Sequence, residues 1–157
     1  MTANAFDRID DWLASAATAL APQQRRKVFR EILRDLRKRN QQRITKQEGP
    51  DGEKWTPRKR GDEGHVRSSA KMLVGLRSAR RMAIKSDSDG GTIGYRGRTA
   101  RIAAVHHYGR VDEVAEDGPR VKYPARPVLG ISTSDVTWIR QRLMDHIADS
   151  VGPGVSR

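Results

Sequence analysis

The chain contains no cysteine among its 157 residues, which excludes disulfides and thiolate metal sites. Aromatic residues make up only 5% and hydrophobic residues 36% of the sequence, low shares for a chain that must bury a core by itself. No apolar run reaches the roughly 20 residues of a membrane-spanning helix. The first residues, MTANAFDRIDDW, are acidic and lack the features of a signal peptide. We therefore expect a soluble protein, made inside the cell, of which either a part is poorly packed alone or the packing is completed by partners.

Positive charge is what the chain has in excess, since 31 Lys and Arg residues against 19 Asp and Glu residues give a net charge of +12. The excess is uneven: residues 22–60 carry fourteen basic and five acidic side chains, whereas residues 106–157 carry seven of each. A length of 157 residues is most simply one domain. The basic first half is either a solvated surface, a contact for nucleic acid phosphates, or a contact for an acidic protein.

A long basic helix is predicted over residues 22–47, because Pro22 suits a first helical turn and Gly49-Pro50 stops the helix. Its apolar stripe consists of Val28, Phe29, Ile32, Leu33 and Leu36. The predicted basic face has six residues: Lys27, Arg30, Arg34 and Lys38 opposite the stripe, and Arg39 and Arg43 beyond its end. Because the stripe stops at Leu36, we expect the second half of this helix to project past the core.

The remaining sequence predicts short elements of both kinds. Further helices are expected over residues 4–20, 66–80 and 98–108, with Gly109 as a C-cap, and over a final segment that starts after Ser132 or Ser134. Two hairpins are expected, one between MAIKS and TIGYRG and one turning at residues 116–119. A flexible loop is expected at residues 49–65 and a frayed tail at 151–157. The order predicts an α+β fold in which a small antiparallel sheet is covered by helices.

Catalytic chemistry finds little support in the sequence. His106 and His107 are neighbours, and neighbours on a helix point about 100° apart, so they do not suit one metal ion; a packed histidine beside a tyrosine is the better interpretation. The segment GGTIG at residues 90–94 joins two predicted strands and lacks the Gly-Lys-Ser/Thr and helix of a phosphate loop. We predict no catalytic residue, no metal and no cofactor.

Three motifs in order carry a family resemblance: GPDGEKWTPRK at residues 49–59, RIAAVHHYG at 101–109, and VKYPARPVLGIS at 121–132 with Asp135 shortly after. Together they resemble the phage virion morphogenesis, or tail completion, family of contractile-tailed phages and prophages, with its S-type neck proteins, from about Leu33 to Ile147. The resemblance implies a structural virion protein that forms a ring at the neck, of six subunits or alternatively twelve. Its implied partners are neighbouring neck, tail terminator or connector proteins, and DNA in the channel.

The segment Tyr123–Pro127 contains two prolines, which fix φ near −65° and favour an extended, rigid backbone. Within the resemblance, a ring needs each subunit to present one patch at one angle, which a rigid segment provides. The alternative is that the segment packs on its own subunit and Arg126 pairs there. Trp55 is either an anchor for its loop or an interface side chain. The residues expected at a subunit or neck-partner interface are Tyr123, Pro124, Ala125, Arg126, Pro127, Leu129 and Trp55.

A second class of function stays open. The basic face also suits a nucleic acid-binding factor that contacts the backbone without sequence preference, because no zinc-finger spacing or RNA-recognition aromatic motif is present. Such a factor would bind duplex DNA as a monomer, with a steep dependence on salt.

Overall fold

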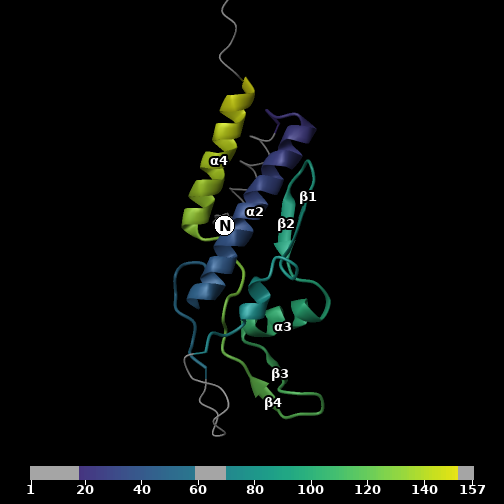
Figure 1. Cartoon of the computed structure of the whole chain (residues 1–157), viewed down its shortest axis with the longest axis vertical. Coiled ribbons are helices and arrows are strands. Elements are labelled where there is room, and N and C mark those ends of the chain that lie inside the picture. Colours follow the sequence, from purple (N-terminus) through teal and green to yellow (C-terminus); the bar gives the residue numbers. More distant parts are fainter. Residues whose placement is uncertain (1–17, 59–69, 152–157) are drawn as a thin grey trace, which may run out of the picture. The chain divides into compact units, whose positions relative to one another are not determined.

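The computed structural model describes residues 18–58 and 70–151 (Figure 1). The helices are α2 (Pro22–Lys46), the 3-10 helix η1 (Val74–Arg77), α3 (Gly97–Tyr108) and α4 (Thr133–Val151); the strands are β1 (Ala83–Ser86), β2 (Gly91–Gly94), β3 (Val111–Glu113) and β4 (Arg120–Lys122). β1 pairs with β2, and β3 with β4. The predicted α+β class and both hairpins are confirmed. Most of the predicted 4–20 helix and residues 152–157 of the tail lie outside the described residues.

The contacts within the chain fall into two compact units. Unit 1 contains the described residues up to Leu36, residues 84–92 and the described residues from Ser132 onward. Unit 2 contains the described residues of 37–83 and residues 93–131. Each unit has its own core, and the number of domains stays a prediction.

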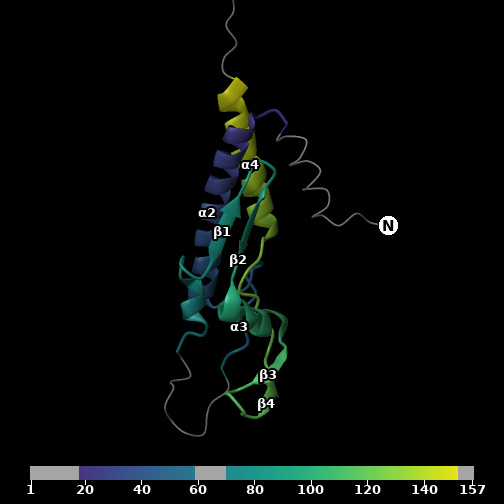
Figure 2. The same ribbon diagram turned by 90° about the vertical axis from the view of Figure 1, so that its right-hand side faces the viewer.

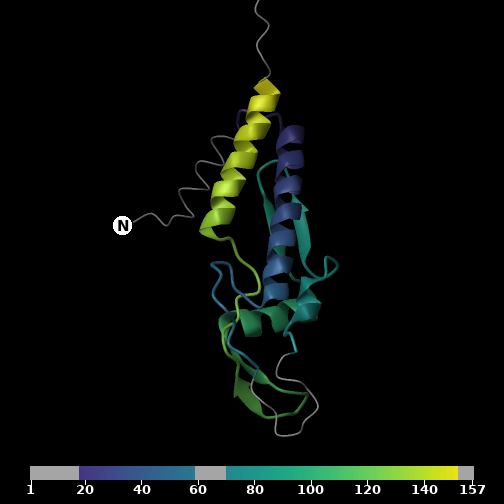
Figure 3. The same ribbon diagram turned by 60° about the vertical axis from the view of Figure 1, so that its left-hand side comes forward.

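The core of unit 1 forms where α4 lies beside the first half of α2 (Figures 1 and 3). Its buried members are Leu20, Val28, Ile32, Ile139 and Leu143, and Trp138 and Ile147 pack against them. On both helices these members recur every four residues, at Val28 and Ile32 in α2 and at Ile139, Leu143 and Ile147 in α4, as expected for amphipathic helices that share an apolar seam. At the edge of this seam, His146 Nε2 lies 3.0 Å from Glu31 Oε2.

A reciprocal pair of hydrogen bonds starts α4. The Asp135 backbone N–H donates to Ser132 Oγ over 3.1 Å, and the Ser132 N–H donates to Asp135 Oδ2 over 2.9 Å. This is a capping box, which satisfies two amide donors that the first helical turn leaves unpaired. Of the two serines expected as caps, Ser132 is the one that acts.

Replacing Asp135 by alanine is expected to destabilise the protein by about 1–2 kcal/mol, because a buried N–H loses its acceptor. Asp135 is 0% exposed, so water cannot substitute for the lost carboxylate. Urea unfolding followed by circular dichroism would measure the change. The control is Asp149→Ala, an exposed residue of the same helix, for which a change below about 0.5 kcal/mol is expected. Equal losses in the two variants would contradict the role of the capping box.

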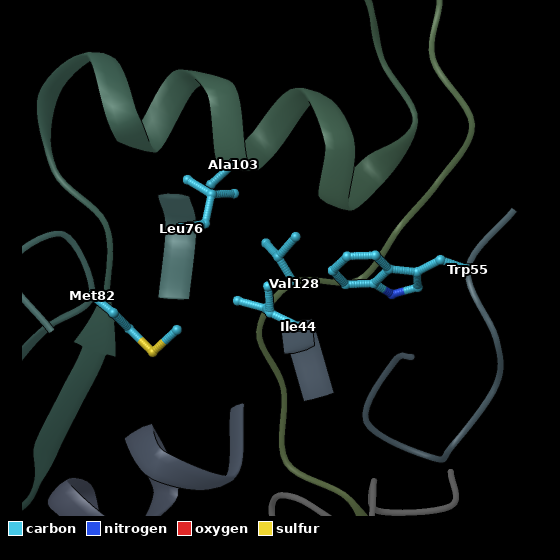
Figure 4. Close-up of a cluster of buried hydrophobic side chains, with 6 residues drawn as sticks. All are labelled: Ile44, Trp55, Leu76, Met82, Ala103 and Val128. Atoms are coloured by element: carbon cyan, nitrogen blue, oxygen red, sulfur yellow. The ribbon is translucent and has the colours of Figure 1, made fainter. Parts of the chain in front are cut away.

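The core of unit 2 joins the second half of α2 to η1, α3 and two loops (Figure 4). Its buried residues are Ile44, Trp55, Leu76, Met82, Ala103 and Val128. The expectation that the second half of α2 projects past the core is therefore wrong: Asn40 is 1% and Ile44 0% exposed. Asn40 can be buried because its side-chain oxygen has hydrogen-bond partners. Its Oδ1 accepts from Gly130 N at 2.9 Å and from Arg43 Nη1 at 3.5 Å.

The helix expected over residues 66–80 is wrong in its described part, where only the short helix η1 forms. The side chain of Gln47 forms hydrogen bonds with both backbone groups of Met72. It accepts from the Met72 N–H at 2.7 Å and donates to the Met72 carbonyl at 2.9 Å. Leu73 then adopts φ 58°, which an α-helix does not allow. A side chain 25 residues away therefore replaces the local hydrogen bonds that a helix would need.

α3 ends as expected at Gly109, which adopts φ 64° and lies against the segment Tyr123–Pro127. A Cβ at Gly109 would come within 2.8 Å of Ala125 N and 3.0 Å of the Tyr123 carbonyl oxygen. The position therefore needs glycine both for its left-handed backbone and for this close approach. In Figure 2 the β3–β4 hairpin follows directly from this end of α3.

Candidate functional site

The segment Tyr123–Pro127, which we call the strap, lies in unit 2 and has no regular secondary structure. Its backbone is tied to the end of α3: Tyr123 N donates to the Arg110 carbonyl at 3.1 Å, and Arg126 N donates to the His106 carbonyl at 2.7 Å. The His106 ring also meets the Tyr123 ring edge to face, with centroids 4.9 Å apart. The strap is therefore held on α3, as the self-packing alternative predicts.

Two large side chains join the strap to the loop that follows α2. Trp55 is 5% exposed, and its Nε1 donates to the Pro127 carbonyl at 3.2 Å. Arg126 is 6% exposed; its Nε donates to the Thr56 carbonyl at 2.9 Å and its Nη2 to the Pro57 carbonyl at 3.2 Å. The expected pairing of Arg126 within its own subunit and the anchoring role of Trp55 are confirmed, while their contact with a partner stays a prediction.

A pocket of about 420 Å³ opens beside the strap, and we call it the cationic pocket. Its lining residues are Arg58, Met72, Leu73, His106, Val121, Lys122, Tyr123, Pro124 and Arg126. Three of these side chains are cationic and none is acidic. Burial, and then the charge of Arg58, lower the pKa of Arg126. Burial, and then the charge of Arg126, lower the pKa of His106, while the charge of Asp112 acts in the opposite direction. The side chains that line the pocket are therefore positively charged overall.

An apolar groove of about 370 Å³ lies beside the segment that follows the strap. Residues 128–131 and the alanines of α3 line it. Leu129, expected at an interface, lines this groove. The Tyr95 hydroxyl is buried here and has no hydrogen-bond partner among the described residues. Burial raises the pKa of Tyr95 above its ordinary value.

The structure divides the predicted basic face. Lys27, Arg30, Arg34 and Lys38 are exposed at three- and four-residue spacing along α2, as expected. Arg39 and Arg43 are only partly exposed, and Arg43 Nη1 donates to the Gly130 carbonyl at 3.1 Å. These two arginines therefore do not join the other four, because they lie on the sides of the helix that flank Asn40 and Ile44.

Residues 5–148 match the phage virion morphogenesis family. The chain belongs to this family. Tail completion protein S of Escherichia phage P2 is 33% identical to it over 149 residues, which cover 92% of this chain and 98% of that protein. No solved structure matches the chain. The predicted resemblance to this family is thus confirmed.

Among the described residues, the chain has no group of three or more His, Cys, Asp or Glu side chains that would hold a metal ion. His107 packs against Tyr108, as His106 packs against Tyr123. In residues 18–58 and 70–151, no helix is long and apolar enough to cross a membrane.

Two of the three cationic side chains in the cationic pocket, Arg58 and Lys122, were not expected at a functional site. Both lie inside the motifs that carry the family resemblance, WTPRK and VKYPARP, so the signal was present. Their proximity was not predictable, because 64 residues separate them in the chain and only the tie between Trp55, Arg126 and the strap brings them to one pocket.

Proposed function

We propose that this chain is a tail completion protein that forms a ring at the virion neck, joins the tail to the head, and has no catalytic activity. The observation that carries the proposal is the match to tail completion protein S, which extends over 92% of this chain and 98% of that protein. Because almost the whole of each chain is matched, a shared role in assembly is the simplest inference. The virion is then where the protein acts, after assembly in the host cytoplasm.

The arrangement of the strap supports the ring. A ring subunit must present the same patch at the same angle in every copy. The two prolines, the Trp55 and Arg126 ties and the bond from Arg126 N to His106 fix the strap on α3. Six subunits is the number we propose, with twelve as the alternative. The neighbouring neck, tail terminator or connector proteins are the further partners.

The exposed cations of α2 favour an acidic protein surface as the partner, with contact to DNA in the channel as the second candidate. Lys27, Arg30 and Arg34 follow one exposed helix face in unit 1, a geometry that also suits duplex phosphates. Neutralising these three residues separates the candidates. A DNA contact predicts that the salt dependence of duplex binding becomes shallower by about 0.9 per lost phosphate contact, whereas a protein contact predicts no duplex binding to lose.

Particle assembly without this protein tests the proposal. A phage that carries a stop codon in its gene is expected to accumulate separate heads and tails in electron micrographs. Adding the purified protein to these lysates is expected to produce joined, infectious particles. Normal yields of joined particles from the defective phage would overturn the proposed role, whatever the oligomeric state of the purified chain.

A further inference from the structure

The cationic pocket has no acidic side chain in its lining to balance its positive charges. Arg126 is buried, and its guanidinium donates to two backbone carbonyls, those of Thr56 and Pro57. Buried charges in proteins are normally compensated by an opposite charge. Instead, Arg58 and Lys122 add two further positive charges to the same pocket, and neither forms an ion pair with the described residues. An anion therefore fits this site better than any other ligand.

One buried polar atom in the pocket has no hydrogen-bond partner among the described residues. His106 lines the pocket, and its Nδ1 is buried without a hydrogen-bond partner among the described residues. Buried polar atoms of this kind are uncommon in native structures. The rest of the wall is apolar, formed by Met72, Leu73, Val121 and Pro124. The ligand should thus carry both an anionic group and an apolar group.

The same unit carries a segment with these properties. Residues 113–117, Glu-Val-Ala-Glu-Asp, form the tip of the β3–β4 hairpin, and we call them the acidic tip. Its three carboxylates are exposed and form no ion pair with the described residues. Val114, between them, is 58% exposed. The turn is held by hydrogen bonds from Gly118 N to Ala115 O at 2.9 Å and from Val114 N to Pro119 O at 3.2 Å.

We propose that the cationic pocket of one copy binds the acidic tip of a neighbouring copy. Tip carboxylates would meet Arg58 and Lys122 at the mouth of the pocket, and Val114 would lie against its apolar wall. Pocket and tip are different surfaces of one unit, so the contact is head to tail and generates a ring or an open filament. The inference rests on the proposed ring and names the surfaces that build it.

Charge reversal tests the contact through the mass of the purified full chain by multi-angle light scattering. The wild-type chain is expected as a multiple of 17.6 kDa. A tip variant, Glu116→Lys with Asp117→Asn, and a pocket variant, Arg58→Glu with Lys122→Glu, should each weaken association by roughly thirtyfold or more. Asn suits the left-handed backbone of position 117, where φ is 58°. Arg126 stays unchanged because it is structural.

Mixing the two variants gives the decisive result. The native tip of one variant fits the native pocket of the other, and at the second contact the lysine introduced into the tip would meet the two glutamates introduced into the pocket. An equimolar mixture is therefore expected to form at least heterodimers, which neither variant forms alone. A folding defect would not be rescued in this way. The control reversals Asp89→Lys and Arg80→Glu, at exposed positions outside the pocket and the tip, should leave the mass unchanged.

Three outcomes would overturn the inference. If both variants keep the mass of the wild-type oligomer, the proposed ring stands and only the contact between pocket and tip is wrong. If the wild-type chain is monomeric at every concentration, both the contact and the ring are wrong. The role in tail completion is then still tested by the particle assay. The third variant is Asp62→Asn with Glu63→Gln, an acidic pair that lies outside the described residues. If this variant loses the oligomer and the tip variant keeps it, the carboxylates that bind to the pocket belong to this pair and not to the acidic tip.

Discussion

Replacing Trp55 by alanine is expected to lower the free energy of unfolding by about 3–5 kcal/mol, the largest stability effect of any single change that we predict. The indole is 5% exposed and packs with Ile44 and Val128 in the core of unit 2 (Figure 4). Truncation leaves a cavity and also removes the donor to the Pro127 carbonyl. Because this bond joins the loop to the strap, the loss should extend beyond the indole itself.

Urea unfolding followed by far-ultraviolet circular dichroism would measure the loss. Trp55→Phe is the matched control, since it keeps an aromatic ring in the core and removes the hydrogen bond to Pro127. Its expected cost is about 1–2 kcal/mol. If alanine costs no more than phenylalanine, the cavity contributes nothing and the packing argument fails.

The elements that the sequence predicted well are those with local causes. α2 was expected at residues 22–47 and lies at Pro22–Lys46, because a proline at one end and Gly49-Pro50 at the other act within a few residues. Gly109 ended α3 for the same kind of reason. The two hairpins followed from turn residues, and Asp87 shows why: its Oδ1 accepts from the N–H groups of Asp89 and Gly90 inside the turn.

The errors came from partners far away in the sequence. Asn40 ended the apolar stripe of α2 in the sequence, yet it is buried because Gly130, 90 residues later, donates to it. Met72 was expected in a helix, yet Gln47 holds its backbone in another conformation. A hydropathy pattern treats a polar residue as exposed, whereas a buried polar residue is stable once its hydrogen bonds are satisfied.

The candidate site likewise has some features with local causes, which the sequence predicts, and others that depend on residues far away in the chain. The rigidity of the strap follows from its two prolines and was predictable, as was the anchoring role of Trp55 in its loop. The cationic pocket was not, since it combines residues of the loop after α2, α3, β4 and the strap. Arg43 was expected to face solvent or a partner, but its guanidinium donates to Gly130, a position that no local pattern indicates.

Arg126 gives the second large effect: Arg126→Met is expected to destabilise the protein by about 2–3 kcal/mol. Methionine keeps most of the aliphatic volume, but the carbonyls of Thr56 and Pro57 lose their charged donors. Removing a buried charge recovers part of this cost, so the net loss should stay below that for Trp55→Ala. Arg126→Lys is the control. One ammonium does not reproduce the planar guanidinium fork, and an intermediate loss is expected.

A double-mutant cycle with Arg58 separates the hydrogen bonds of Arg126 from its charge. Burial, and then the charge of Arg58, lower the pKa of Arg126, and two cations that line one pocket repel each other. Arg58→Met alone should therefore leave stability unchanged or slightly higher, and any gain should vanish in the Arg126→Met background. An unchanged stability of Arg126→Met would mean that the guanidinium does not hold the strap. The strap would then depend on Trp55 and on its backbone bonds to α3 for the rigidity that a ring interface requires.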